Sequence, residues 1–261
     1  MTELAGILNL TPDSFSGDGL QGAVTSTLAR IDKMVESDIA VVDIGAESTR
    51  PGAQPLTWEE EWTRLAPVVE KLGSRTERIQ FSIDTRHGEC ARRALEKGFH
   101  WINDVSSGSD PAMQLLVKEY KCKYVLMHSM SIPADPAHTI AANVNAVDEV
   151  MRWAEQSIAK WEQAGIERSQ LILDPGIGFG KTVEQSLMLI KNIATFQRTG
   201  IALLVGHSRK SFLSQFTDGK PELRDAATMA ISSYLMAQNV DYLRVHDIEA
   251  HAMLKRISDM L

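Results

Sequence analysis

The sequence has a deficit of positive charge, only two cysteines and no long hydrophobic run. Its 261 residues include 27 lysines and arginines against 34 aspartates and glutamates, which gives a formal net charge of -7. We therefore expect no nucleic-acid partner, because phosphate backbones bind strongly basic surfaces. A small anionic substrate remains compatible with this charge, since it needs only a local cluster of cationic groups.

The two cysteines, Cys90 and Cys122, have neither the spacing of metal ligands nor that of a disulfide framework, so we expect them to pack in a reducing compartment. No run of about 18 apolar residues is present to span a membrane. The first ten residues lack the basic and apolar regions of a signal peptide. We therefore expect a cytoplasmic protein that has no membrane partner.

Short apolar runs recur along the whole chain, with helical patterns between them. The runs lie at 4–9, 39–45, 79–84, 99–104, 123–128, 170–174, 201–206 and 240–246. Most are continuously apolar, as expected for parallel strands that are buried on both faces. With no linker or change of composition, the chain is close to the roughly 250 residues of a (β/α)8 barrel. We predict an α/β fold with one TIM-barrel domain over 1–261, and the count of eight favours this closed barrel over an open doubly wound sheet.

The helical segments have recognisable beginnings. Thr57 with Glu60, and Thr182 with Gln185, have the spacing of capping boxes. Residues 145–164 carry apolar side chains at helical spacing. These signals predict helices that start near 58, 146 and 183.

Each of the eight runs ends in a polar residue. The terminal residues are Asn9, Asp43, Asp84, Asn103 with Asp104, His128, Asp174, His207 with Ser208, and Arg244 with His246. A buried strand often ends in a polar residue as it reaches solvent, which explains one or two cases. Eight cases dominated by Asp, Asn and His instead favour a catalytic rim, because TIM-barrel active sites lie at the carboxyl ends of the strands.

Three loops after these runs have unusual composition. The first places Phe15 in a polar turn, which is either a simple connection or a mobile lid. The second contains Arg50 before Pro51, which is either a capped turn or a donor loop for an anionic or aromatic ligand. In the third, 174–182, alternating glycines allow close approach to a flat ligand and Phe179 offers a stacking face.

Charged residues at the predicted rim also have two interpretations. Lys210 and Arg209 follow the seventh run, and Arg244 and His246 end the eighth. They are either ordinary surface charges or an anion site, and we favour the anion site because barrels commonly bind phosphate after strands seven and eight.

Asp84 and Asp174 are costly to bury unless they are paired. Their partner is either a nearby cation or a ligand with adjacent N–H donors, and the residues alone leave both open. His87, His100, His138 and His251 lie in helices or loops without metal-binding spacing, and we assign them no role.

The motifs taken together resemble those of dihydropteroate synthases. The matching segments are GILNLTPDSFS (6–16), DIGAESTRPGA (43–53), SIDT (82–85), INDVS (102–106), LDPGIGFGKT (173–182), GHSRKSF (206–212) and RVHD (244–247). They follow the family order and extend over nearly the whole chain. The resemblance implies a pterin-binding TIM barrel that condenses 6-hydroxymethyl-7,8-dihydropterin pyrophosphate with p-aminobenzoate. It further implies the products 7,8-dihydropteroate and pyrophosphate, and hence a transferase of folate biosynthesis that is a sulfonamide target.

The resemblance also implies a role for individual residues. It implies that the pterin is bound by Asp84, Asn103, Asp174 and Lys210. It also implies that pyrophosphate is bound by Asn9, Arg244 and His246, and that Asn9 also binds Mg²⁺. The p-aminobenzoate pocket is shaped by Phe15, Thr49, Arg50, Pro51, Phe179 and Ser208. The catalytic residues that the resemblance implies are Lys210, Arg244 and His246.

The chain departs from the family pattern in several loops. Ala46 and Ala227 stand where the family usually has glycine, and the first and fifth loops read SFSGDG and MHSMSIP. These departures motivate one alternative, a pterin-binding paralogue with weak or no synthase activity. A pterin-binding methyltransferase barrel ranks lower, because it should lack the ESTRP and SRK elements around Arg50 and Lys210. A generic sugar-phosphate barrel enzyme ranks lower, because it leaves the pair of Phe15 and Phe179 unexplained. The family commonly dimerises through outer helices, so we expect a homodimer through 223–238 and 248–260.

Overall fold

The computed structural model describes residues 1–10, 19–37, 39–49, 52–135, 137–220 and 223–260. Its strands are β1 (Glu3–Asn9), β2 (Val41–Gly45), β3 (Gln80–Asp84), β4 (Trp101–Asp104), β5 (Lys123–Met127), β6 (Leu171–Asp174), β7 (Ala202–Val205) and β8 (Tyr242–Val245). Each strand pairs in parallel with the next, and β8 closes the ring against β1. The predicted TIM barrel is confirmed, and every strand begins within two residues of its predicted run.

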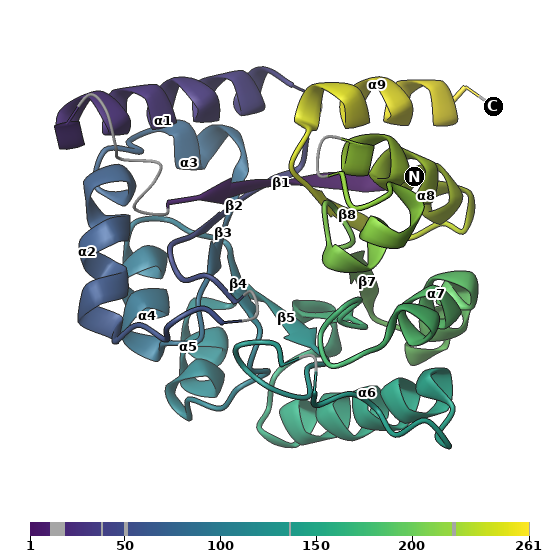
Figure 1. Ribbon diagram of the computed structural model, residues 1–261. Helices are drawn as coiled ribbons and strands as arrows, with labels where there is room; N and C mark the ends of the chain where they lie inside the picture. Colours follow the sequence, from purple (N-terminus) through teal and green to yellow (C-terminus); the bar gives the residue numbers. More distant parts are fainter. Residues whose placement is uncertain (11–18, 38, 50–51, 136, 221–222, 261) are drawn as a thin grey trace.

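Helices surround this barrel on all sides (Figure 1). They are α1 (Gly19–Glu36), α2 (Trp58–Val69), α3 (Arg75–Arg78), α4 (Gly88–Glu96), α5 (Ala112–Tyr120), α6 (Ala146–Gln163), α7 (Val183–Lys191), α8 (Arg224–Ala237) and α9 (Ile248–Ser258). Short 3-10 turns are η2 (Arg168–Gln170), η3 (Ile193–Thr199) and η4 (Ser211–Phe216). Among the described helices, none is both long and apolar enough to cross a membrane.

Both predicted capping boxes are present. The hydroxyl of Thr57 accepts from the backbone N–H of Glu60 at 3.3 Å, and the Glu60 carboxylate accepts from the N–H of Thr57 at 2.9 Å. Thr182 and Gln185 exchange the same two bonds at the start of α7. Each box satisfies two N–H groups that the first turn of a helix otherwise leaves unpaired.

The apolar core has two parts. The larger lies between the strands and the helices, as the outward side chains of buried parallel strands require. The smaller fills the barrel interior near the amino ends of the strands. It consists of Ala5, Val41, Trp101, Val125, Ile172 and Leu204, with Ala40, Ala202 and Tyr242 packed against it.

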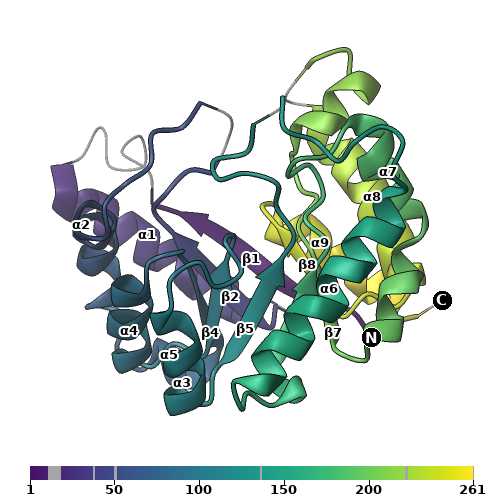
Figure 2. The ribbon, with the colours of Figure 1, turned by 90° about the horizontal axis from the view of Figure 1, so that it is seen from below.

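This interior cluster closes one end of the barrel. The indole of Trp101 lies edge-on to Tyr242, with ring centroids 4.9 Å apart, and donates to the Gln80 side chain at 2.7 Å. Side chains along a strand alternate between its two faces. Residues two positions beyond the cluster therefore also point into the barrel, and three of these six positions are polar: Asp43, Asn103 and Asp174. Figure 2 shows the strands in side view, with the described parts of the long loops after β2 and β5 at the open end.

Candidate active site

Arg244 lies at the centre of a polar cluster inside the barrel. Its Nε donates to Oδ2 of Asp43 at 2.6 Å, and its Nη2 donates to Oδ2 of Asp84 at 2.5 Å. The Asn103 amide donates to the same Asp43 oxygen at 3.1 Å. Burial opposes the charge of the guanidinium, but the two carboxylates outweigh it and raise the pKa of Arg244 further. The guanidinium therefore stays charged while it joins β8 to β2 and β3.

Asp84 has a carboxyl group that titrates near neutrality. Burial raises the pKa of Asp84 to about 7, and the neighbouring Asp43 adds to this rise, while Arg244 opposes it. The Asp84 side chain is 25% exposed, so it remains accessible from the open end of the barrel. Ionised, it accepts hydrogen bonds from N–H donors; protonated, it loses part of that capacity.

Asp174 and Lys210 form the other side of the cluster. Burial raises the pKa of Asp174, and the charge of Lys210 opposes that rise. Burial likewise lowers the pKa of Lys210 to about 8, against the attraction of Asp174. The Lys210 ammonium donates to the carbonyl of Ile177 and lies 4.4 Å from the ring centre of Phe179. Lys210 therefore connects the loops that follow β6 and β7.

The barrel interior contains polar atoms without hydrogen-bond partners among the described residues. They are Oδ1 of Asp43 and Oγ of Ser82, on neighbouring strands. Asp43 is only 2% exposed, and a buried carboxylate oxygen without a partner is costly. Such atoms point to a ligand or water in the space above them. The strand-end pattern included Asp43 without a role, although its alternation with Val41 predicts an inward side chain.

Two more of the predicted site residues, Ser208 and His246, contact each other at the rim. Nδ1 of His246 lies 3.0 Å from the Ser208 hydroxyl, which also accepts from the His246 backbone N–H at 3.3 Å. Arg209, by contrast, forms two bonds with Asp225 on α8, at 2.6 and 2.8 Å. Arg209 thus belongs to a surface ion pair and is removed from the predicted anion site. That prediction now includes only Lys210, Arg244 and His246.

Asn9 and Thr49 lie at the open end of the barrel. Asn9 is exposed at the end of β1, next to Gly45, which in turn neighbours Asp84. Thr49 is half-buried, and its carbonyl accepts from Ala134 N–H at 3.2 Å, which joins the loops after β2 and β5. The other predicted p-aminobenzoate residues, Phe15, Arg50 and Pro51, lie outside the described residues.

Three polar strand ends point away from the interior and hold the structure together. Asp104 accepts from Ser106, Gly108 and Tyr124. His128 lies 2.8 Å from the buried ammonium of Lys181, and His207 lies 2.8 Å from the Ser232 hydroxyl. Burial lowers the pKa of both histidines to about 3, so they are neutral. The catalytic interpretation of the rim is therefore restricted to the inward residues, for which it stays a prediction.

The glycines of the loop after β6 pack against protein. All three have left-handed φ angles, and a Cβ on Gly176 would lie 1.8 Å from the carbonyl oxygen of His128. A Cβ on Gly180 would lie 2.3 Å from Met130. A Cβ on Gly178 would lie 3.3 Å from Lys210. The close approach that we predicted for a flat ligand is, for Gly176 and Gly180, an approach to the loop after β5.

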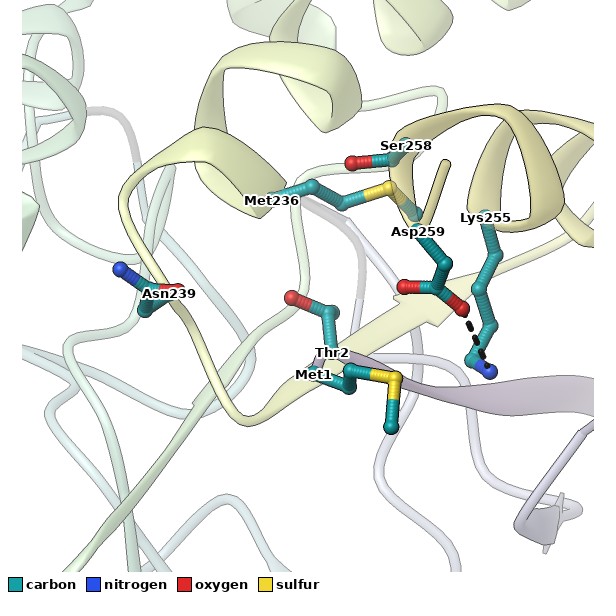
Figure 3. Close-up of a pocket in the computed structure, with 7 residues that line it drawn as sticks. All are labelled: Met1, Thr2, Met236, Asn239, Lys255, Ser258 and Asp259. Carbon is teal, nitrogen blue, oxygen red and sulfur yellow. Dashed lines mark hydrogen bonds and ion pairs between the residues drawn. The ribbon is translucent and has the colours of Figure 1, made fainter. Parts of the chain in front are cut away.

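A cavity of about 220 Å³ lies at the opposite end of the barrel (Figure 3). Its walls include Met1, Asn239 and the ion pair between Lys255 and Asp259, 3.4 Å apart. These residues precede β1 and β8 or lie at the end of α9, so the cavity is remote from the polar cluster. The interior cluster around Trp101 lies between this cavity and the open end of the barrel.

A closed TIM barrel with acidic, amide and cationic side chains at the carboxyl ends of its strands defines an enzyme that binds a polar ligand inside the barrel mouth. Residues 5–246 match the model of the family described as pterin binding enzyme. The chain belongs to that family, which confirms the resemblance that the motifs predicted.

Known proteins support the same assignment. A folate synthesis bifunctional protein of Chlamydia caviae is 38% identical over 256 residues, which cover 96% of this chain but 57% of that protein. The chain thus spans little more than half of that relative. The dihydropteroate synthase of Escherichia coli is 35% identical over 252 residues, which cover 97% of this chain and 89% of the relative. A crystal structure of dihydropteroate synthase from Anaplasma phagocytophilum with bound 6-hydroxymethylpterin-monophosphate has a TM-score of 0.90 and 32% identity, and the match covers 99% and 98% of the two chains.

Proposed function

We propose that this chain is a dihydropteroate synthase, a transferase that joins 6-hydroxymethyl-7,8-dihydropterin pyrophosphate to p-aminobenzoate and releases pyrophosphate. The observation that carries the proposal is the cluster of Asp43, Asp84, Asn103 and Asp174 around Arg244 and Lys210 in the barrel interior. Folate biosynthesis is the pathway to which this reaction belongs.

The carboxylates and the amide suit the pyrimidinone edge of a pterin. That edge presents an exocyclic amine and a ring N–H beside a carbonyl oxygen, so it needs adjacent acceptors and at least one donor. Asp84 and Asp174 supply acceptors, Asn103 supplies either kind, and Lys210 supplies a donor. A pterin that satisfies the open oxygen of Asp43 or the hydroxyl of Ser82 removes a desolvation cost already present in the protein.

The cations suit the departing diphosphate. When the carbon–oxygen bond breaks, negative charge grows on the leaving group and the pterin methylene becomes electron-deficient. Arg244 and His246, on the same strand end, neutralise that charge where it develops. We propose that ring N–H donors of the pterin replace Arg244 on Asp84, which frees part of the guanidinium for the diphosphate.

Mg²⁺ fits the open end of the barrel as a weakly held ion. Asn9 offers one neutral amide oxygen there, and Mg²⁺ usually keeps several waters and shares substrate phosphate oxygens. When bound, the ion would add charge neutralisation for the diphosphate. The protein groups that bind pterin, Asp84, Asn103 and Asp174, act without it.

The second substrate needs a pocket near the mouth and little base catalysis. The arylamine of p-aminobenzoate is nucleophilic as the free base, attacks the methylene and then loses a proton. We propose that Phe179, Thr49 and Ser208 flank its ring and carboxylate, together with Phe15, Arg50 and Pro51. The link from Thr49 to Ala134 supports a joint role of the second and fifth loops in excluding water.

A substrate-dependent assay of pyrophosphate release tests the function. The protein should release pyrophosphate only when both substrates are present, and Lys210→Ala and Asp174→Ala should each abolish turnover. Near-native rates in either variant would contradict the assigned roles. The alternative, a paralogue with weak or no synthase activity, would bind the pterin in calorimetry without releasing pyrophosphate, and the altered fifth loop around Met130 motivates it.

We further propose that the chain acts as one cytoplasmic domain and forms a homodimer through its last helices. Apolar side chains are exposed on α8 and α9, including Tyr234, Met253 and Ile257. The two helices pack against each other, so these side chains can form a common surface. Light scattering coupled to size exclusion would give the mass, and a monomer at micromolar concentration would contradict this proposal.

A further inference from the structure

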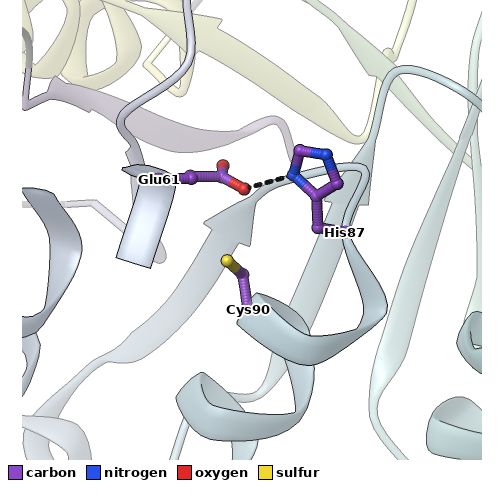
Figure 4. A group of neighbouring side chains, drawn as sticks. All are labelled: Glu61, His87 and Cys90. Atoms are coloured by element: carbon purple, nitrogen blue, oxygen red, sulfur yellow. Dashed lines mark hydrogen bonds and ion pairs between the residues drawn. The ribbon is translucent and has the colours of Figure 1, made fainter. Parts of the chain in front are cut away.

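Glu61, His87 and Cys90 converge behind the third strand, outside the active site. Glu61 comes from α2, His87 immediately precedes α4, and Cys90 lies in the first turn of α4. A carboxylate oxygen, the imidazole nitrogen and the thiol sulfur lie within 4.8 Å of one another. In the part of the chain that the structure describes, this is the one such group of three metal-ligating side chains. Figure 4 shows the three side chains directed toward a common space.

The carboxylate of Glu61 is buried and only half satisfied. Its Oε2 accepts from the Thr85 hydroxyl at 2.7 Å and lies 2.8 Å from Nδ1 of His87. Its Oε1 has no hydrogen-bond partner among the described residues, although Glu61 is 0% exposed. A buried carboxylate oxygen without a partner is costly, so the arrangement favours a cationic group beside Cys90.

We propose that Glu61, His87 and Cys90 bind a zinc-class transition-metal ion. Zinc accepts this mixture of thiolate, imidazole and carboxylate ligands, whereas Mg²⁺ and Ca²⁺ prefer oxygen alone. Three protein ligands leave a fourth position for water or for the nearby hydroxyl of Thr85. The site is separate from the proposed synthase chemistry and from the Mg²⁺ at Asn9.

The geometry requires only a local adjustment. Ligands of one tetrahedral zinc lie about 3.4–3.8 Å apart, as follows from bond lengths of roughly 2.0–2.3 Å. The Cys90 sulfur must therefore move about an ångström closer to the other two ligands by turning away from the carbonyl of Trp58, to which it now donates at 3.3 Å. Nδ1 of His87 and Oε2 of Glu61, now 2.8 Å apart, must instead move slightly apart. The His87 side chain is 20% exposed, so an ion can enter past the imidazole.

Proton balance follows from the present hydrogen bonds. Burial raises the pKa of the Cys90 thiol, so the thiol carries its proton before metal binds. Binding forms the metal–sulfur bond and releases that proton to solvent. The imidazole binds through Nδ1, so the proton that Nδ1 now donates to Glu61 must leave this nitrogen. The hydrogen bond to Glu61 raises the pKa of His87, and the imidazolium form therefore releases its Nδ1 proton to solvent and keeps the proton on Nε2. The nearby Arg86 is already paired with Glu47, at 2.9 and 3.0 Å, so its charge is largely compensated.

A bound ion would fix the segment that follows Asp84. Thr85 donates to Glu61 through its hydroxyl and to the Asn103 carbonyl through its backbone N–H at 3.0 Å. The metal site would therefore stabilise the carboxyl end of β3 from outside the barrel. We expect a structural contribution, seen as a rise in the melting temperature, rather than a part in the reaction.

Cobalt titration of the untagged, chelator-treated protein tests the proposal under reducing conditions. We expect one equivalent of Co²⁺ to produce a near-ultraviolet thiolate-to-cobalt charge-transfer band, which Zn²⁺ abolishes and Mg²⁺ does not. The chain has two cysteines, so Cys122→Ser is the matched control for Cys90→Ser. The band should survive in the former and disappear in the latter. Zn²⁺ should raise the melting temperature of the wild type and of Cys122→Ser only.

A second variant covers the case in which Cys90→Ser fails to fold. His87→Gln should weaken Co²⁺ binding by at least about tenfold, as ligand-sphere changes commonly do. His138→Gln, which alters an exposed histidine paired with Asp135, should bind Co²⁺ like the wild type. Absence of a saturable band in the wild type would overturn the proposal. So would an unchanged band in Cys90→Ser, or unchanged affinity in His87→Gln.

Discussion

Nη2 of Arg244 donates to Oδ2 of Asp84 at 2.5 Å, which joins the last strand of the barrel to the third. The same guanidinium donates to Asp43 on the second strand at 2.6 Å. One cation thus compensates a buried carboxylate, Asp43, and a partly buried one, Asp84. The charges of Asp43 and Asp84 are therefore both compensated by the Arg244 side chain. A substrate that hydrogen-bonds to Asp84 must compete with Arg244 for that carboxylate.

Arg244→Ala should destabilise the protein strongly above neutral pH. The substitution leaves the buried carboxylate of Asp43 and the partly buried carboxylate of Asp84 without their cation, and breaking a buried pair typically costs about 3–5 kcal/mol. Asp84 already has a pKa raised to about 7, so it can accept a proton as the pH falls below that value. A raised carboxyl pKa means that protonation favours the folded state. Urea unfolding should therefore show a larger loss at about pH 8 than at about pH 5.5.

Arg209→Ala is the matched control, because Arg209 forms a bidentate pair with Asp225 on the surface. An exposed pair of this kind contributes about 0–1 kcal/mol. Equal losses in the two variants, or a loss in Arg244→Ala that does not depend on pH, would contradict the role assigned to the buried cluster.

The pH dependence of kcat/KM should be a narrow bell. Pterin binding through N–H donors requires ionised Asp84, so the rate should rise as the pH passes about 7. The cationic form of Lys210 is also required, so the rate should fall as the pH passes about 8. Such a profile reports the free enzyme. Steady-state pyrophosphate release between about pH 5.5 and 9.5 measures both limbs, and a flat profile across 7 to 8 would refute these two roles.

Replacing Asp84 with asparagine separates the two limbs. Asp84→Asn cannot ionise, so the acidic limb near pH 7 should disappear together with most of the activity, while the basic limb remains. Lys191→Ala, at an exposed lysine on α7, should keep the full bell. An acidic limb that persists in Asp84→Asn would assign it to another group.

Strand positions were predictable because buried parallel strands are continuous apolar runs. The direction of each polar strand end was harder to predict. Asn103 and Asp104 are adjacent, yet only Asn103 faces the interior, while Asp104 binds Tyr124 and the loop after β4. Strand alternation from Trp101 resolves this pair, but a run without alternating polarity does not reveal which residues face inward.

Contacts between loops could not be predicted from a single sequence. Arg209 and Lys210 are neighbours of like charge, but one pairs with α8 and the other reaches the carbonyl of Ile177. Glu61, His87 and Cys90 have no recognisable metal spacing, because Glu61 and His87 are 26 residues apart and meet only in the folded helix layer. In both cases tertiary packing decides the role, and no local pattern encodes it.

Acid should destabilise the protein below about pH 6.5 through its buried neutral histidines. His207 has a pKa lowered to about 3 by burial, against an ordinary value of 6.5. Its folded pKa is depressed, so the unfolded chain binds the proton first as the pH falls. Stability that is fully present above pH 6.5 is then lost at up to about 1.4 kcal/mol per pH unit for this one group.

The comparison of His207→Gln with His138→Gln isolates that contribution. Glutamine can keep a donor toward Ser232, which now lies 2.8 Å from the His207 ring. Urea unfolding at about pH 7, 6 and 5 should show a shallower pH dependence in His207→Gln than in the wild type. The exposed His138 variant should retain the wild-type slope, and equal slopes in all three proteins would show that His207 protonates in the folded state.

Gly176→Ala should damage both the fold and the activity more than an alanine at any open glycine. Gly176 has φ +67, and the new Cβ would lie 1.8 Å from the carbonyl oxygen of His128. Its backbone N–H also donates to Asp174 at 2.7 Å, so a shift of this peptide moves a carboxylate of the active site. Gly200 has a similar φ of +69, but nothing lies within 4 Å of its added Cβ. Gly200→Ala should therefore cost only the left-handed backbone penalty of about 1–2 kcal/mol, with normal pyrophosphate release.

Gly176→Ala carries that penalty and a steric clash with backbone, so chemical unfolding should show a greater loss of the free energy of unfolding. Any folded fraction should turn over slowly. Similar stability and activity in the two variants would mean that the loop after β6 can move away from His128 without disturbing Asp174, and that the contact between the loops does not position the carboxylate.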